Sequence, residues 1–199
     1  MAGAGAGGAL AGIIIARNLK ALQAGIEKAE REWAGVDGFA IEAETMEGLL
    51  DATSGKTRPT LRGRRAGVEI QVQIKSDVVH YAWTEVSAPV TAGVDAKLGV
   101  HPSPGGVLGY LRSLIGQDIE VGDEAFDAGY LITGEPEGFA RALLVPSVRE
   151  RIAVLGQKLA AFHYSRERVW VTLHGVETDH ELLGAAIDRV AAGASFQPA

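Results

Sequence analysis

The stretch VEIQVQIK, residues 68–75, decides the fold class because its side chains alternate strictly between apolar and polar. Val and Ile take positions 68, 70, 72 and 74, and charged or amide side chains fill the positions between them. Since successive side chains of a strand point to opposite faces, this period of two predicts a strand with one buried face. Ser76-Asp77 then supplies a turn, and residues 78–87, rich in Val, Tyr, Trp and Thr, are predicted to be the hairpin partner.

The rest of the chain adds a second hairpin and several helices. Strand-like segments are predicted near 96–100, at 119–121, at 130–133, and as a hairpin at 162–164 and 169–173. Helices are predicted at about 105–115, 136–145, 147–158 and 181–190. Because hairpins and helices follow one another without strict alternation, the sequence predicts an α+β domain with a mostly antiparallel sheet and helices packed on it. The 199 residues suit one such domain at 35–199, preceded by a distinct part at 1–34.

A long helix is predicted from about residue 13 to residue 34. Apolar residues recur there at spacings of three and four, at Ile15, Leu19, Leu22, Ile26, Ala29 and Trp33. This spacing gives a helix one apolar seam. Two uses of the seam stay open: it packs on its own domain, or it binds a second copy of the chain through Leu19, Leu22, Ile26 and Trp33.

The first sixteen residues, MAGAGAGGALAGIIIA, contain no charged side chain. A helix of this length spans about 24 Å, less than the roughly 30 Å of a bilayer's hydrocarbon core. The segment is therefore either a marginal membrane anchor or a flexible Gly/Ala tail. Its nearest positive charges, Arg17 and Lys20, follow the apolar run, which argues against a secretory signal. If the segment inserts, the positive-inside rule places the domain on the cytoplasmic side.

Composition removes several classes of function. The chain has no cysteine, so disulfides, thiolate catalysis and cysteine-ligated metals are excluded. Its formal net charge of -6 argues against binding to nucleic acid, which depends on clustered Lys and Arg. No arrangement of serine, histidine and carboxylate residues matches a catalytic motif, so no catalytic residue is assigned.

Residues 54–57, SGKT, look like the end of a phosphate-binding P-loop. A P-loop needs a glycine five positions before Gly55, where this chain has Leu50. It also needs a helix starting at the Lys-Thr pair, and Pro59 follows too closely for that. The sequence therefore predicts no nucleotide and no other cofactor.

A basic cluster lies in the predicted loop that leads into the first strand. Its members are Lys56, Arg58, Arg62, Arg64 and Arg65. Cations at this density are typical of surfaces that contact anions or lipid headgroups, and equally of solvated turns.

One group of residues has the composition of a metal site. His174, Glu177, Asp179 and His180 lie within seven residues and could offer nitrogen and oxygen ligands to zinc or manganese. Such a site would make the protein a metal-dependent hydrolase. The alternative is helix capping, in which Thr178 and Glu181 open the last helix.

One segment resembles a known pattern. The run Gly122-Asp123-Glu-Ala-Phe126-Asp127-Ala-Gly-Tyr130-Leu-Ile132 is followed by Gly134-Glu-Pro and by Ala142-Leu-Leu-Val-Pro146. It is similar to a family of uncharacterised bacterial proteins in which a GDxxFDxxFxV segment precedes an acidic turn and a helix ending in Leu-Leu-x-Pro. The resemblance implies a membrane-proximal α+β domain and no known activity. The aromatic and Ile residues of the segment are expected in the core, and its Gly and Asp residues are expected to shape a turn.

Taken together, these patterns favour a non-enzymatic interaction or scaffold module, tethered at the cytoplasmic face of a membrane through residues 1–34. Its expected partners are another protein or a second copy of the chain, with membrane contact through residues 1–16 and no nucleic acid. The alternatives are the metal-dependent hydrolase and a self-assembling structural protein.

Overall fold

The computed structural model describes residues 6–44, 58–76, 82–90, 93–103 and 118–197. The strands are β1 (Phe39–Glu44), β2 (Arg58–Arg65), β3 (Val68–Ser76), β4 (Ala82–Pro89), β5 (Lys97–Pro102), β6 (Tyr130–Glu135), β7 (Leu159–Tyr164) and β8 (Arg168–His174). The helices are α1 (Ala6–Trp33), α4 (Glu124–Gly129), α5 (Glu137–Leu143), α6 (Pro146–Val154), the short 3-10 helix η1 (Gly156–Lys158) and α7 (His180–Ala194).

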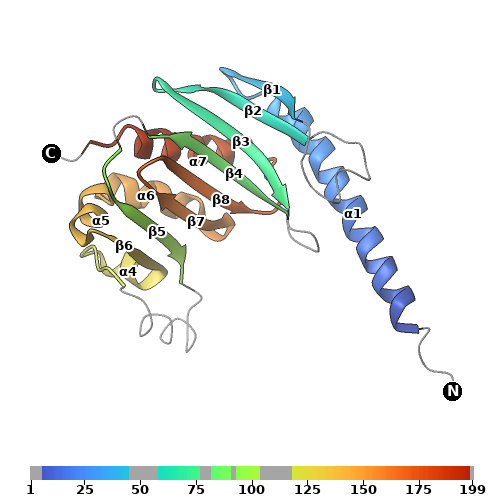
Figure 1. Cartoon of the computed structure of the whole chain (residues 1–199), viewed down its shortest axis with the longest axis horizontal. Coiled ribbons are helices and arrows are strands. Elements are labelled where there is room, and N and C mark those ends of the chain that lie inside the picture. The colour runs from blue at the N-terminus through green and yellow to red at the C-terminus, as the bar shows by residue number, and fades with distance from the viewer. Residues whose placement is uncertain (1–5, 45–57, 77–81, 91–92, 104–117, 198–199) are drawn as a thin grey trace.

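The described strands form one 8-stranded sheet in the order β1-β2-β3-β4-β8-β7-β5-β6 (Figure 1). Every neighbouring pair is antiparallel. The predicted α+β class is therefore confirmed. The two predicted hairpins lie at the centre of the sheet, where β4 of the first pairs with β8 of the second.

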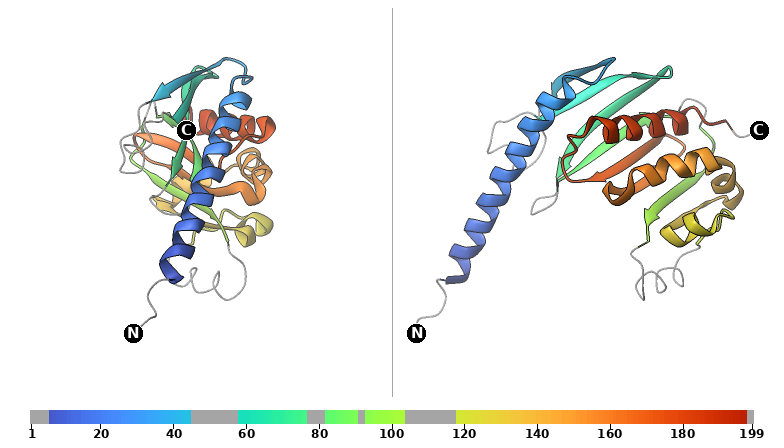
Figure 2. Two further views of the ribbon diagram at one scale, coloured as in Figure 1. Left: turned by 90° about the vertical axis from the view of Figure 1, so that its right-hand side faces the viewer. Right: turned by 180° about the vertical axis from the view of Figure 1, so that it is seen from behind.

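The described helices of the domain lie on one face of the sheet (Figure 2). The central helix, α7, packs against β2, β3, β4 and β8, and α5 and α4 pack against β6. The last turns of α1 pack against β2, and the rest of the helix extends away from the domain. None of the described helices covers the opposite face, which is called here the open face of the sheet.

The alternation of VEIQVQIK is realised in β3. Residues 68, 70, 72 and 74 are buried, and the residues between them are half-buried or exposed. The buried side chains contact the helix layer, so the polar residues of the same strand lie on the open face. The alternation that predicts the strand therefore also decides which residues line this face.

Two parts of the sheet differ from the sequence prediction. Residues 58–65 were expected in a loop, but they form β2, an interior strand between β1 and β3. Their charges conceal a strand whose one large apolar side chain, Leu61, is fully buried. Residues 119–121 are not a strand; instead the Ile119 amide donates to the Ile132 carbonyl at the edge of β6 (2.8 Å). The predicted helix at 105–115, Asp77 of the predicted turn and the first residues of the predicted hairpin partner (78–81) lie outside the described residues.

The Gly-Asp segment at 122–127 forms the turn expected of it. Gly122 has a positive φ of 79°, which glycine adopts without steric cost. The Asp127 carboxylate accepts the amides of residues 121, 122 and 123. Asp123 caps α4 by accepting the Phe126 amide and pairs with Arg149 of α6 (3.0 Å). Phe126 is buried and stacks on Tyr130. These residues hold β6, α4 and α6 together, so their role is structural.

Substitution of Gly63 by alanine should test how closely β1 and β2 approach. A Cβ at this position would lie 2.5 Å from the Phe39 ring and from the Gly38 carbonyl oxygen. We expect Gly63→Ala to lower the free energy of unfolding by about 1–3 kcal/mol in a urea titration. The matched control is Gly184→Ala on α7, where the new Cβ meets nothing within 4 Å. Helix propensity should make this control neutral or more stable by up to about 1 kcal/mol, and equal losses in the two variants would contradict the packing described.

Candidate functional site

Glu177 lies in the connection between β8 and α7 and is 3% exposed. Its Oε1 accepts the amides of Thr178 (2.9 Å) and Asp179 (2.8 Å). The Lys158 ammonium lies 3.3 Å from its Oε2, as an ion pair. Its own amide donates to Thr84 Oγ1 on β4 (2.8 Å). The carboxylate of Glu177 thus stabilises the turn that follows it, and its backbone amide joins the connection to the sheet.

The other three residues of the expected metal site have separate roles. Asp179 caps α7 by accepting the amides of Glu181 and Leu182, so the cap is Asp179 and not Thr178. His180 Nε2 lies 3.4 Å from the Glu32 carboxylate of α1. His174 is exposed at the end of β8.

Within the described ranges, no three His, Cys, Asp or Glu side chains are grouped so that they could hold a metal ion. His174, Glu177, Asp179 and His180 all lie in the described ranges and form no such group, so the metal site stays a prediction that this arrangement does not support. The polarity of the segment reflects backbone capping, and metal-dependent hydrolysis has no structural support there.

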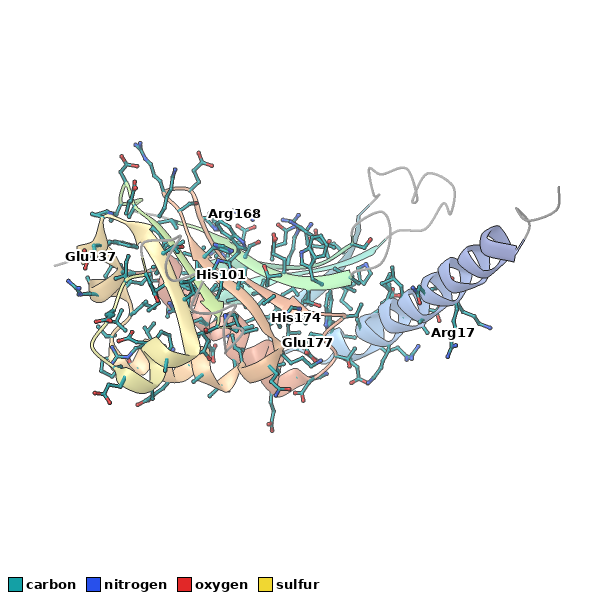
Figure 3. All side chains as sticks on the ribbon, turned by 90° about the horizontal axis from the view of Figure 1, so that it is seen from below. Arg17, His101, Glu137, Arg168, His174 and Glu177 are labelled. Carbon is teal, nitrogen blue, oxygen red and sulfur yellow. The ribbon has the colours of Figure 1, made fainter. Side chains whose placement is uncertain are left out.

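The same segment is the docking site of α1 (Figure 3). Trp33 is fully buried, and its indole Nε1 donates to the Glu177 carbonyl oxygen (3.0 Å). Ala29, one turn earlier, is also fully buried. Gly25 faces Val176, because a Cβ built on Gly25 would lie 3.5 Å from the Val176 Cβ. The end of the helical seam is thus packed on its own domain.

This packing divides the residues proposed for self-association. Trp33 is fully buried in its own core, so it is not available to a second copy. Ile26 and Leu22 are half-buried, and Ile26 packs against the core. The side chain of Leu19 lies outside the description, so self-association through the seam before Trp33 stays a prediction.

The N-terminal part of α1 extends beyond the domain (Figures 1 and 2). Arg17, Asn18 and Lys20 are exposed along it. Among the described residues, no helix is both long enough and apolar enough to cross a membrane.

The expected basic cluster is dispersed. Strand alternation directs Arg62 and Arg64 to the open face and Arg65 to the helix face. Arg62 lies 3.0 Å from the Glu42 carboxylate, and Arg65 lies 3.3 Å from Asp188 of α7. The side chain of Arg58 and the whole of Lys56 lie outside the described residues. Of the three arginines whose side chains are described, two lie on the open face and one on the helix face, and contact of the basic cluster with an anion stays a prediction.

The open face carries a polar and aromatic row that crosses six strands. The strand register aligns Arg62, Gln71, Ser87, Trp170, His163 and Gly99. The absence of a side chain at Gly99 allows Thr133 and His101 to lie close to the backbone there, because a Cβ at this position would lie 3.0 Å from Thr133 Oγ1 and 3.2 Å from His101 Nε2. Large side chains at the centre of a sheet face that no described helix covers are typical of a binding surface.

Trp170 is the centre of this row. The His163 ring stacks on it at 4.7 Å, and the Arg168 guanidinium lies 4.2 Å from its ring centroid. Arg168 and Lys75 both pair with Glu85, whose side chain is only 8% exposed. These contacts fix the orientation of the indole before any partner binds, which lowers the entropic cost of binding.

A shallow hollow of about 340 Å³ adjoins the row at one end of the sheet. It is lined by Arg62, Glu69, Gln71, Ser87, Ala88, Pro89, Glu167 and Arg168. The hollow joins β2 to β8 across the two strands between them, so a ligand placed there would contact four strands.

Burial lowers the pKa of His163 to about 4, and the neighbouring His101 and Arg168 add to the effect, while Glu85 opposes it. The imidazole is therefore neutral at pH 7. A neutral ring can donate one hydrogen bond and accept another, so His163 can bind an amide or hydroxyl group of a partner.

The sequence patterns above do not predict this row, although the sequence contains part of its signal. Residues 162–164 and 169–171 alternate, with His163 and Trp170 between side chains that prove to be buried. Their outward direction could have been predicted from the period of two. Their proximity depends on the order of the strands, which no local pattern gives.

The comparisons with known proteins bear on the fold. No protein-family model matches the sequence, and no curated protein matches it. Among solved structures, the chain is similar to the crystal structure of the mycobacterial trehalose monomycolate transport factor A, TtfA. The TM-score is 0.57 and the identity is 13%, with 88% of this chain and 98% of that chain covered. At this identity the comparison shows a shared fold and not a shared activity.

Replacement of Trp33 by phenylalanine should weaken the docking of α1. The ring stays, but the buried Glu177 carbonyl oxygen loses its hydrogen bond, at a cost of about 1–3 kcal/mol in the free energy of unfolding. The matched control is Trp83→Phe, since Trp83 is half-buried and its indole nitrogen makes no hydrogen bond among the described residues. We expect the control to change stability by less than about 1 kcal/mol in the same urea titration. Identical losses would show that the hydrogen bond contributes nothing.

The low pKa of His163 should make stability depend on pH in a defined window. Between about pH 6.5 and pH 4 the unfolded chain protonates this residue and the folded chain does not, so stability falls as the pH is lowered through that range. We expect His163→Gln to flatten the curve of melting temperature against pH within this window. His174→Gln, at an exposed position, should leave the curve unchanged. A curve for His163→Gln that parallels the wild type would contradict the assignment.

Proposed function

We propose that this protein is a non-enzymatic interaction module attached to another structure through α1. The observation that carries the proposal is that α1 is docked at its C-terminal end and free along the rest of its described length (Figure 2). A helix used only to complete the core would be covered along its length. The part that extends from the domain is therefore available for a membrane surface or a partner helix.

The composition of the N-terminal part supports attachment to a membrane. Residues 1–16 carry no charge, and Arg17, Lys20, Lys28 and Arg31 follow them. Cations in this position favour contact with anionic headgroups on the cytoplasmic side. In this proposal residues 1–16 contact the lipid and the domain remains on the cytoplasmic side.

The open face supports binding of a protein. A preorganised indole between a histidine and an arginine is typical of interface centres, where Trp and Arg are enriched. The hollow beside it is lined by hydrogen-bond donors such as Arg62 and Arg168 and by acceptors such as Glu69 and Glu167, which a polypeptide backbone could use. We propose that a protein partner covers this face and that Trp170 contributes most to its affinity.

The similar fold gives the proposal a biological setting. TtfA is described as a transport factor for trehalose monomycolate. We propose that this chain is likewise an accessory component of a transport assembly, which binds other components and does not catalyse a reaction.

Sedimentation of cell lysate tests the attachment. Full-length protein is compared with a version that begins at Arg17, which keeps the docked turns of α1. We expect only the full-length protein to sediment with membranes and to be released by detergent. The melting temperature of the domain, followed by circular dichroism, should be the same in both versions.

Two results would contradict the proposal. If both versions stay in the supernatant and both are monomers at high micromolar concentration, α1 attaches to neither a membrane nor a second copy. If both versions sediment equally, the attachment lies elsewhere in the chain. A third result would change the proposed target of α1. If neither version sediments with membranes and only the full-length chain forms dimers, α1 binds a second copy of the chain and not a membrane.

A further inference from the structure

Arg189 of α7 is a charged residue in the apolar layer between α7 and the sheet, and nothing in the packing of the fold requires a charge there. The residue is 0% exposed, and its side chain points into the layer between α7 and the sheet. Its guanidinium carbon lies 4.1 Å from the centroid of the Phe162 ring on β7. A fully buried arginine is uncommon unless it is paired with a carboxylate.

None of its three side-chain nitrogens has a hydrogen-bond acceptor among the described residues. The contact with Phe162 places the guanidinium carbon over the ring, and it supplies no hydrogen-bond acceptor for the five N–H groups in the way that an oxygen would. The donors are therefore left in a medium of low polarity without acceptors, which is strongly unfavourable. Burial accordingly lowers the pKa of Arg189 to about 9, and the group is still charged at pH 7.

A second cation lies nearby. Arg151, exposed on α6, lowers the pKa of Arg189 further through charge repulsion. Among the described residues, neither arginine forms an ion pair with a carboxylate. Asp188, the acidic residue next to Arg189 in the sequence, pairs with Arg65 instead (3.3 Å). Two cations, one of them fully buried, thus have no counter-charge in the part of the chain that the structure describes.

We propose that Arg189 and Arg151 bind a small oxyanion, a carboxylate or a phosphate, between α6 and α7. The planar fork of a guanidinium matches two oxygens of either group. In this proposal Arg151 attracts the ion at the surface, and Arg189, packed against the Phe162 ring, holds it behind.

Thermal unfolding of the full chain in Tris chloride buffer at constant ionic strength tests the proposal. Phosphate and acetate are titrated separately up to about 10 mM. At anion concentrations above the dissociation constant, we expect the melting temperature to rise by about 3–5 °C for each tenfold increase in the concentration of free anion. The anion that gives the larger rise identifies the preferred oxygen group.

Arg189→Met keeps the length of the side chain and removes its charge. We expect it to fold, to melt at a higher temperature than the wild type in the absence of oxyanions, and to lose the response to both anions. Arg166→Met, at an exposed position, is the matched control and should respond like the wild type. Absence of any response in the wild type, or an equal response in Arg189→Met, would overturn the proposal.

Calorimetric titration of phosphate and acetate into the full chain tests the anion site even if Arg189→Met fails to fold. Binding by the wild type that weakens severalfold in Arg151→Met supports the site. No measurable binding of either anion, or the same affinity in both proteins, overturns it.

Discussion

The hydrogen bond from the Trp33 indole to the Glu177 carbonyl oxygen is the contact on which the arrangement of this protein depends (3.0 Å). It joins α1 to the connection between β8 and α7. Glu177 also holds that connection on the sheet through Thr84 and folds it through the amides that follow. Because one residue satisfies all these groups in a buried place, α1 leaves the domain in a fixed direction. The direction of α1 is what presents the domain to whatever the helix binds.

The two faces of the sheet have different roles. The helix face holds the apolar core, and the open face holds polar and aromatic side chains that stabilise one another, such as Glu85 between Lys75 and Arg168. The described part of the open face is therefore preorganised without being covered. Within the helix face, Arg189 is buried like a core residue but keeps a charge with no acceptor among the described residues. An uncompensated charge in an apolar layer is a place where an ion of opposite charge gains strongly from binding.

Much of the fold could be predicted from local patterns. The alternation at 68–75, the hairpin at 159–174 and the turn at 122–127 each depend on residues close in sequence. The prediction was wrong for β2, because Arg side chains on an interior strand look like a loop until β1 and β3 are placed beside it. The site was harder to predict. His174, Glu177, Asp179 and His180 have the composition of a metal site, but the Glu177 and Asp179 carboxylates accept backbone amides and the His180 imidazole lies against Glu32 of α1. The row through Trp170 joins residues from 62 to 170, and only the strand order brings them together.

The most direct test of the fixed junction is amide hydrogen exchange along α1 in the isolated protein. The account predicts that the amides of residues 29–33 exchange as slowly as those of β3, because they open only with the domain. The amides of residues 17–20, whose described side chains are exposed, should exchange orders of magnitude faster. Equally fast exchange over the whole of α1 would show that Trp33 does not hold the helix on the domain, and would contradict the account.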